Sequence, residues 1–322
     1  MEILKLDLSH KSLVNPDIDR FINLTILDLS FNCISNINLD NLTKLQELKL
    51  NNNKLCQFSC NLPNLHILDL SNNSIQSVNL NLPNLQDLNL SYNLISKINI
   101  CRQLIKANLT YNRIDSITGE FNNLEWLDIS HNNLIELPNE MPNLQLLNAS
   151  YNELTTIPNI NANTCTIYLF NNLITEANLD SFSNLKQLGL SGNQITSINI
   201  KNPNLTHLYL ADNFLKELEI NNLQFLQILY VQGNQLTSIK LTNLPSLYAL
   251  YIFENKIELL PESITLLRNL YDFIFHANPI KNLDELAINE FIKYTKRIYN
   301  PYAHIKSASF FINLKYISSH AY

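Results

Sequence analysis

Cysteine and histidine are the residues of this chain whose side chains could act as nucleophiles, general bases or metal ligands. Its five cysteines are Cys33, Cys56, Cys60, Cys101 and Cys165, and only Cys56 and Cys60 lie close together in sequence. The seven histidines are scattered along the chain. A metal site would need further ligands at a matching spacing, and the GxSxG, HExxH and P-loop motifs of common enzymes do not occur. The sequence therefore predicts no catalytic residue, no metal site, no cofactor and no enzyme activity.

The charge distribution limits the class of partner. A formal net charge of -6 without a run of Lys or Arg argues against nucleic acid and against an anionic membrane, because both bind clustered basic side chains. No apolar run approaches the ~20 residues that span a bilayer, and the start, MEILKLDLSHKSLV, lacks the pattern of a Sec signal peptide. With an odd number of cysteines, this predicts a reducing compartment, either the cytoplasm or a host cell reached by a non-Sec route.

A repeated frame organises nearly the whole chain. In NLQDLNLSYNLISKINICR, apolar residues occupy frame positions 1, 4, 6 and 11, and Asn occupies position 9. Side chains two apart in an extended chain point to the same side, so positions 4 and 6 face a core while positions 3, 5 and 7 face water. Fourteen repeats, 19 to 21 residues long except for one of 23, begin at Ile3, Leu24, Leu45, Leu65, Leu85, Leu104, Leu124, Leu144, Thr164, Leu185, Leu205, Leu226, Leu247 and Leu270.

The asparagine of the frame is present in every repeat except the first, where Lys11 replaces it. The chain turns out of the strand at this position, and an amide can both donate and accept hydrogen bonds to the backbone groups that the next coil buries. These residues are Asn32, Asn53, Asn73, Asn93, Asn112, Asn132, Asn152, Asn172, Asn193, Asn213, Asn234, Asn255 and Asn278.

With the pattern LxxLxLxxNxL at this spacing, residues 1–280 resemble the leucine-rich repeat family. The resemblance implies an α/β repeat solenoid of horseshoe shape with a parallel β-sheet on its concave side. Coils of about 20 residues cannot bury their own apolar side, which agrees with stacking. Apolar residues at period two, such as Ile198 and Ile200, predict a mostly extended or turn-like convex side, and LLPESITLLRNL in the 23-residue repeat predicts a helical turn.

Two subfamilies share features with the chain. In repeat length it resembles the short-repeat effectors of Gram-negative pathogens, most closely from Leu134 to Pro158, whereas NINLDNLTKL is similar to the intracellular phosphatase-regulator type. Such effectors often carry a C-terminal ubiquitin-ligase domain with a catalytic cysteine. No cysteine follows Cys165, so the resemblance does not extend to that activity.

The ends of a solenoid expose its core and need caps. His10 and Lys11 make the first coil more polar, so we expect it to serve as its own cap. Residues 281–322 lose the frame, and the helical spacing of apolar residues in LDELAINEFIKYTKRI predicts an amphipathic helix laid over the last coil. We therefore divide the chain into a repeat solenoid, residues 1–280, and a helical C-terminal cap, residues 281–322.

Aromatic residues at the water-facing positions are the candidates for binding another protein. Frame position 5 changes from mostly Asp and Asn to mostly Tyr after the eighth repeat, and Gly189 interrupts the column, leaving a gap for a partner's side chain. Parallel strands lie ~4.8 Å apart, so the tyrosines would be contiguous, and aromatic anchors dominate many protein interfaces. The predicted binding residues are Trp126, Tyr168, Phe170, Tyr209, Tyr230, Tyr251 and Phe253.

Two other columns are weaker candidates. We interpret the aromatic residues at frame position 8, which are Phe31, Tyr92, Tyr111, His131 and Tyr151, as structural. The acidic column of Asp7, Asp28, Asp69 and Asp128 is interpreted as a solvated face.

The sequence as a whole predicts a non-enzymatic interaction scaffold that binds a partner protein on its concave face, acting as a pathogen effector or a viral protein on host proteins. The alternatives are a regulatory subunit of a phosphatase or ubiquitin ligase, tyrosines that only stack their strands, and, least favoured, an enzyme with a site in residues 281–322.

Overall fold

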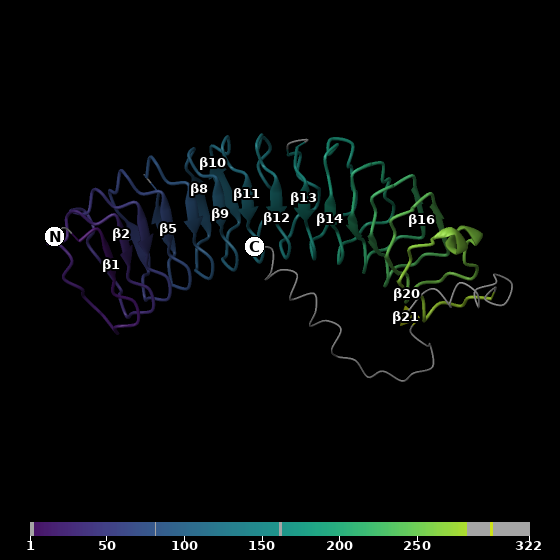
Figure 1. The fold of residues 1–322 in the computed structure, drawn as a ribbon, viewed down its shortest axis with the longest axis horizontal. Helices are drawn as coiled ribbons and strands as arrows, with labels where there is room; N and C mark the ends of the chain where they lie inside the picture. The colour runs from purple at the N-terminus through teal and green to yellow at the C-terminus, as the bar shows by residue number, and fades with distance from the viewer. Residues whose placement is uncertain (1–2, 81, 161–162, 282–296, 299–322) are drawn as a thin grey trace.

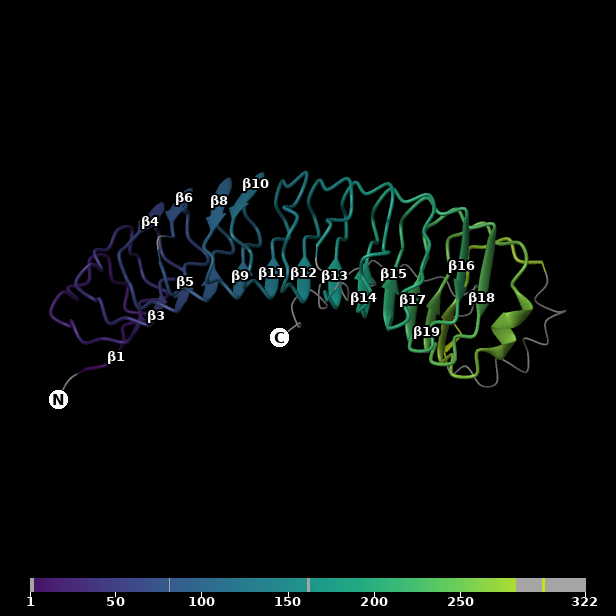
Figure 2. The ribbon, with the colours of Figure 1, turned by 90° about the horizontal axis from the view of Figure 1, so that it is seen from above.

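The computed structural model describes residues 3–80, 82–160, 163–281 and 297–298, and it shows an arched solenoid (Figure 1). A 15-stranded parallel sheet runs along the concave side, and the convex arcs lie opposite it (Figure 2). The strands of this sheet, in spatial order, are β1 (Lys5–Asp7), β2 (Ile26–Asp28), β3 (Glu47–Lys49), β5 (Ile67–Asp69), β7 (Asp87–Asn89), β9 (Lys106–Asn108), β11 (Trp126–Asp128), β12 (Leu146–Asn148), β13 (Thr166–Tyr168), β14 (Gln187–Gly189), β15 (His207–Tyr209), β17 (Ile228–Tyr230), β19 (Ala249–Tyr251), β20 (Asp272–Ile274) and β21 (Arg297–Ile298).

Strands β1 to β20 of this sheet each cover frame positions 3 to 5 of one predicted repeat. Neighbouring strands pair without a shift of register, so that Leu27 lies opposite Leu48 and Leu88 opposite Ala107. The position-4 side chains of neighbouring strands therefore lie side by side and point into the core. The predicted repeat frame, the parallel concave sheet and the solenoid are confirmed.

The convex side is mostly turns with three short two-stranded parallel sheets. These are β4 (Gln57–Ser59) with β6 (Ser77–Asn79), β8 (Lys97–Ile100) with β10 (Ser116–Gly119), and β16 (Glu217–Asn221) with β18 (Ser238–Thr242). A 3-10 helix, η1 (Glu262–Leu266), occupies the 23-residue repeat. The prediction of an extended or turn-like convex side, with one helical turn in the longest repeat, therefore agrees with the structure. None of the helices in the described part has the length and hydropathy to cross a membrane.

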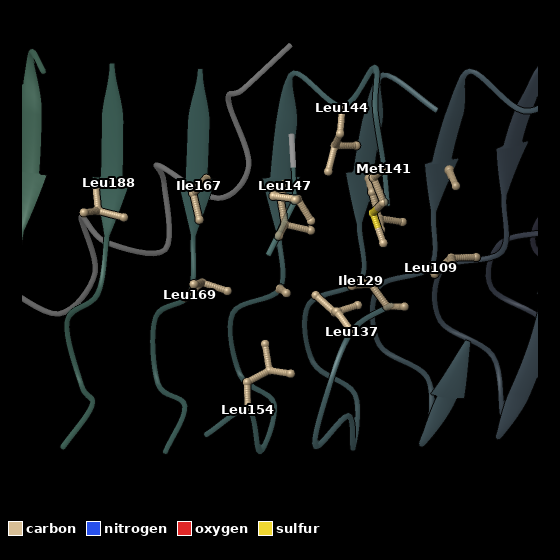
Figure 3. Close-up of a cluster of buried hydrophobic side chains, with 14 of the residues drawn as sticks. Leu109, Ile129, Leu137, Met141, Leu144, Leu147, Leu154, Ile167, Leu169 and Leu188 are labelled. Carbon is tan, nitrogen blue, oxygen red and sulfur yellow. The ribbon is translucent and has the colours of Figure 1, made fainter. Parts of the chain in front are cut away.

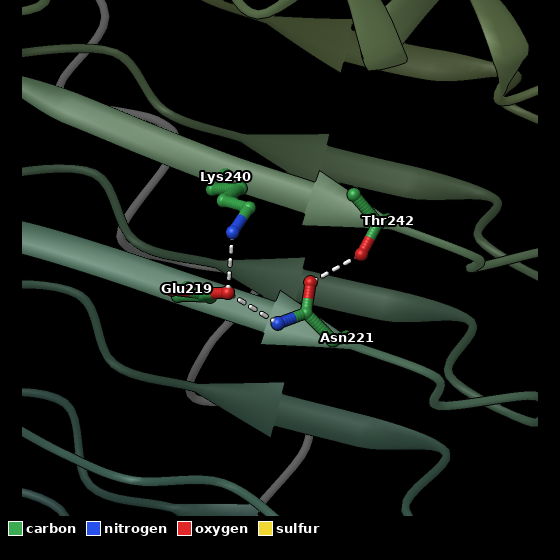
Figure 4. A network of polar contacts seen from close by, with 4 residues as sticks. All are labelled: Glu219, Asn221, Lys240 and Thr242. Carbon is green, nitrogen blue, oxygen red and sulfur yellow. Dashed lines mark hydrogen bonds and ion pairs between the residues drawn. The ribbon is translucent and has the colours of Figure 1, made fainter.

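Polar side chains connect the two strands of the last convex sheet (Figure 4). Lys240 Nζ lies 2.7 Å from Glu219 Oε1, which also accepts a hydrogen bond of 2.6 Å from Asn221 Nδ2. Thr242 Oγ1 donates to Asn221 Oδ1. Such cross-strand pairs each contribute roughly 0.2–1 kcal/mol, so they support this sheet without deciding the fold.

One continuous hydrophobic core fills the solenoid, and side chains of successive coils interdigitate in it (Figure 3). From the second repeat on, residues at frame positions 1, 4 and 6, such as Leu144, Leu147 and Leu169, are buried. The frame asparagines line the core where each coil leaves the sheet. Asn132 is typical, because its Nδ2 donates to Leu109 O and its Oδ1 accepts from the Ile114 N–H in the preceding coil.

The two ends differ from the sequence-based expectations. Ile3, Leu4 and Val14 are about half exposed, so the first coil presents apolar side chains and does not form the polar cap that we expected. At the other end, most of the predicted cap, 281–322, lies outside the described residues. Residues 297–298, which were predicted to be helical, form strand β21 and pair with β20. The helical form of the cap is therefore not supported, because sheet pairing with the last repeat competes with the helix at this point.

Candidate protein-binding surface

Six of the predicted binding residues lie together on the concave sheet. We call Tyr168, Phe170, Tyr209, Tyr230, Tyr251 and Phe253 the aromatic patch; they belong to β13, β15, β17 and β19 and to the turns that follow β13 and β19. The Tyr230 and Tyr251 rings stack with centroids 4.3 Å apart, and the Tyr209 and Tyr230 rings meet edge to face at 5.3 Å. Phe170 contacts Tyr209 at 5.9 Å. The patch therefore crosses Gly189 on β14 without interruption.

The patch has a buried layer that sequence position did not reveal. Tyr209 is 6% exposed and Tyr251 is 8% exposed, whereas Tyr168, Phe170, Tyr230 and Phe253 are half-buried. The sequence analysis placed all of these tyrosines at water-facing positions, but Tyr209 and Tyr251 are covered by neighbouring side chains. Large rings on strands ~4.8 Å apart cover one another, so alternate members become the floor for their neighbours.

The expected gap at Gly189 was also wrong, because Phe170 fills it. A Cβ added to Gly189 would lie 2.3 Å from Cζ of Phe170, well inside van der Waals contact. The missing side chain therefore accommodates a ring of the same chain. Frame position 7 carries Ser in most other repeats, and the change to Phe170 in the repeat before Gly189 was the signal that could have predicted this contact.

Hydrogen bonds fix two of the phenols. Tyr251 Oη donates to Asp272 Oδ2 at 2.5 Å, and Tyr168 Oη donates to Gln187 Oε1. Burial raises the pKa of both tyrosines, and the Asp272 carboxylate raises the pKa of Tyr251 further because a negative neighbour disfavours the phenolate. The phenols are therefore neutral donors at physiological pH, and the patch presents apolar ring surface with few free polar groups.

The structure adds neighbours that the aromatic pattern missed. Ala249 and Ile274 pack with Tyr251 in a small cluster separate from the main core, and Tyr230 and Phe253 pack against it. His276 stacks on Phe253 at 4.8 Å. Ile274 was visible in the frame-position-5 column, whereas Ala249 lies at position 3 and gave no aromatic signal.

Trp126 lies apart from the patch. It sits on β11, opposite Lys106 and Leu146 and two strands from β13. The ring contacts found among the described residues do not include Trp126. The structure therefore does not join the seventh predicted binding residue to the other six.

The acidic column is tied into the strand ends. Asp28, Asp69 and Asp128 each accept hydrogen bonds from the N–H and Oγ of the serine two residues later, at 2.6–3.0 Å. Asp7 accepts from the N–H of Ser9 at 2.9 Å, and this bond lowers its pKa. Burial instead raises the pKa of Asp128. Each of these carboxylates thus has a local structural role at the end of its strand.

A second aromatic row, which we call the edge stack, consists of Tyr92, Tyr111, His131 and Tyr151 at frame position 8. Successive rings stack with centroids 4.0–4.4 Å apart and planes 9–11° from parallel. All fourteen residues at this frame position have positive φ, from 52° to 72°, which bulky side chains seldom adopt. The geometry agrees with a structural role, although the tyrosines are each about half exposed.

The thiols show no features of a reactive site. All five cysteines are free, and burial raises the pKa of Cys60 to about 12, so that it stays protonated. Cys56 is exposed while Cys60 is half-buried. Within the described residues, no three His, Cys, Asp or Glu side chains are grouped so that they could hold a metal ion.

Comparison with known proteins agrees with this architecture. The family model described as Leucine Rich Repeat matches residues 23–45 and 123–144. No curated protein matches the chain by sequence.

Solved structures share the fold. A leucine-rich-repeat protein of Leptospira interrogans superposes with a TM-score of 0.66 at 24% identity, covering 92% of this chain and 84% of that one. YopM from Yersinia enterocolitica gives 0.67 at 23% identity, with 86% and 72% covered. The functional domain of InlJ from Listeria monocytogenes gives 0.72 at 19% identity, with 88% and 65% covered.

Proposed function

We propose that this chain, which is a leucine-rich-repeat protein, is a non-enzymatic scaffold that binds another protein through the aromatic patch on its concave sheet. The observation that carries the proposal is the contiguity of the patch. Four half-buried aromatic side chains stand on a floor made by two buried tyrosines, so the exposed rings are held in place before a partner arrives. Binding to a surface that is already ordered costs less conformational entropy than binding to mobile side chains.

The chemistry of the patch favours an apolar or aromatic segment of a partner protein. The two phenols that are tied to Asp272 and Gln187 cannot turn toward a partner without losing those bonds. What remains accessible is ring surface from Tyr230, Phe170 and Phe253, flanked by Ile228. Interfaces are dominated by a few such anchors surrounded by a polar rim. On the neighbouring strands β11 and β12, Asp128 and Asn148 are polar side chains on the concave side.

The test replaces half-buried members of the aromatic patch. Replacing Tyr209 or Tyr251 would instead remove the buried rings on which the other aromatic side chains rest. We would immobilise the full chain, the double variant Tyr230→Ala with Phe253→Ala, and a control double variant, Tyr92→Ala with Tyr151→Ala. The control removes two aromatic rings that are about half exposed on the edge stack. Circular dichroism and thermal melting establish that all three chains are folded before proteins are captured from lysate and identified.

The expected result is a protein that the parent and the control variant retain and that the patch variant loses. The same set of proteins on all three chains would refute the patch as the binding site, and the tyrosines would then serve only to stack the strands. A protein lost with both variants would point to a surface that spans both aromatic rows, which also contradicts the proposal.

We also propose a compartment for this scaffold from its cysteines. Five free thiols favour a reducing compartment, and we extend the proposal to the cytoplasm or to delivery into a host cell. Residues 281–322 remain in the proposal as a cap of the last repeat, with β21 as its described part. Deletion of residues 281–322 should then lower the melting temperature, whereas an unchanged melting temperature would remove the cap from the proposal.

A further inference from the structure

Two acidic side chains border the aromatic patch on the concave side. Asp212 and Glu254 occupy frame position 8, where the chain turns out of β15 and β19 with φ of 53° and 54°. Both residues are exposed, and Glu254 follows Phe253 directly. Frame position 8 carries an acidic residue in no other repeat. The two carboxylates therefore occur only in the repeats whose position-5 residues are the buried tyrosines Tyr209 and Tyr251.

The two carboxylates approach each other across the coil that separates them. Strand β17 of this coil pairs with β15 on one side and with β19 on the other (Figure 2). Gly233 takes frame position 8 in this coil, and a Cβ added to it would lie 2.1 Å from Oδ1 of Asp212. The Asp212 carboxylate therefore lies over Gly233, in the direction of Glu254. Burial raises the pKa of Asp212, and the Glu254 carboxylate raises it further because like charges repel.

Within the described residues, no donor neutralises this negative charge. The ion pairs found there do not involve Asp212 or Glu254, and neither carboxylate accepts a hydrogen bond from the described part of the chain. The acidic column of the first eight repeats differs, because the serine two residues after each Asp donates to it. Gln232, on the coil between the two carboxylates, has a buried Oε1 that also lacks a donor there. This border of the aromatic patch thus has unpaired acceptors.

We propose that the partner segment bound by the aromatic patch carries a lysine or arginine beside its apolar anchor, and that this cation pairs with Asp212 and Glu254. The inference rests on the function proposed above and adds the charge of the partner. Successive residues of an extended segment are ~3.3 Å apart, so a segment whose apolar side chain lies on Phe253 brings its next residues to Glu254. A cation there supplies the missing donors, whereas an acidic side chain would add a third like charge.

The pairing gives the aromatic patch a selectivity that ring surface alone lacks. Apolar contacts accept aromatic and aliphatic side chains from many sequences. Charges at the border of an interface reject partners of the same sign and speed association with partners of the opposite sign. The aromatic rings therefore supply most of the contact area, and the two carboxylates select which apolar segments are bound.

The probe that tests this inference is a displayed library of random heptapeptides, selected on the immobilised full chain. Peptides that also bind the patch variant, Tyr230→Ala with Phe253→Ala, are removed, so that the remaining peptides depend on the aromatic patch. Synthetic copies of these peptides are then titrated by fluorescence anisotropy against the parent and against the acid variant, Asp212→Asn with Glu254→Gln.

The matched control is Asp115→Asn with Glu136→Gln, which removes the same two charges at exposed positions away from the concave sheet. Asn and Gln keep the shape of the side chains that they replace. Circular dichroism and thermal melting establish that every variant is folded before the titrations.

The expected peptides carry Lys or Arg within two residues of an aromatic or aliphatic residue. They should bind the acid variant roughly three- to tenfold more weakly than the parent at low salt, with a smaller difference at about 0.5 M salt, and bind the control like the parent. Patch-dependent peptides that lack a basic residue, or that bind the acid variant as tightly as the parent, would overturn this inference and leave the proposed function standing. A library that yields no patch-dependent peptide would overturn both.

Discussion

Replacing Asn132 with Ala should destabilise the solenoid locally, by an amount that its hydrogen bonds define. Nδ2 donates to the carbonyls of Leu109 at 3.0 Å, Ile129 at 3.0 Å and Ser130 at 3.2 Å, and Oδ1 accepts from the N–H of Ile114 at 2.8 Å. One amide thus satisfies backbone groups on two neighbouring coils, and its side chain is 7% exposed.

The bonds differ in what their loss would leave behind. Each of the three carbonyls keeps a second donor, which is Nδ2 of Asn112, Nδ2 of Asn152 or the N–H of Tyr111. The N–H of Ile114, a fully buried residue, loses its side-chain partner. An unsatisfied buried donor costs roughly 1–3 kcal/mol, and the weakened carbonyl bonds add to it. We therefore expect Asn132→Ala to lower the free energy of unfolding by ~2–4 kcal/mol.

Urea denaturation followed by circular dichroism measures the loss, and hydrogen exchange locates it. Asn133→Ala is the control, because Asn133 is the adjacent residue and is exposed, so its replacement should stay within about 0.5 kcal/mol. The amide of Ile114 should exchange faster in Asn132→Ala alone. Equal unfolding midpoints for the two variants, with an unchanged exchange rate at Ile114, would refute the role assigned to the asparagine ladder.

Two further predictions concern packing and pH. Leu208→Ala should lower the free energy of unfolding by ~2–5 kcal/mol because Leu208 is fully buried. Tyr209→Ala should lower it by ~2–4 kcal/mol because the Tyr209 ring is almost fully covered. Thermal unfolding measures both losses, and a loss below ~1 kcal/mol for Tyr209→Ala would mean that the ring is solvated. Burial lowers the pKa of His131 in the folded chain below its ordinary 6.5. The unfolded chain therefore binds a proton at His131 more readily than the folded chain, and the folded chain loses stability as the pH falls below about 6.5. His131→Phe keeps the ring stack, as Phe31 does at the same frame position with φ 55°, and should reduce the difference in melting temperature between about pH 7.5 and about pH 5.5; an equal difference in both proteins would contradict this.

The fold could be predicted from the sequence because its determinants are local and repeated. Leu88 and Leu90 are two apart and Asn93 follows, and this short pattern is enough to place strand β7 and the turn after it. Because the frame recurs in many repeats, it can be recognised even where one residue departs from it, such as Ala107 at a position where Leu is usual. The first coil and residues 297–298 lack neighbouring repeats that could correct such exceptions, and the expectations about the fold that failed concern these two ends.

The binding surface was less predictable because its burial depends on how side chains from different repeats fill space. Frame position says that Tyr209 leaves the sheet toward the concave side, and that is correct. It does not say where the neighbouring rings lie, and Phe170 turns across Gly189 to reach Tyr209. That contact joins residues 39 positions apart in sequence, so a frame column that holds one position per repeat could not show it.

The curvature of the sheet explains why the patch forms a supported layer. Side chains on the inside of an arch converge, so a column of small polar residues stays solvated while a column of large rings becomes crowded. In the first eight repeats, frame position 5 carries Asp, Asn or Lys, and its four acidic side chains accept hydrogen bonds from the serine two residues later, at the end of their own strand. From the ninth repeat on, the rings have no such local bond available and pack on one another. The same change of residue type therefore creates both the buried floor and the apolar surface above it, and variants that thin the floor should weaken binding and stability together, whereas Tyr230→Ala with Phe253→Ala should weaken binding first.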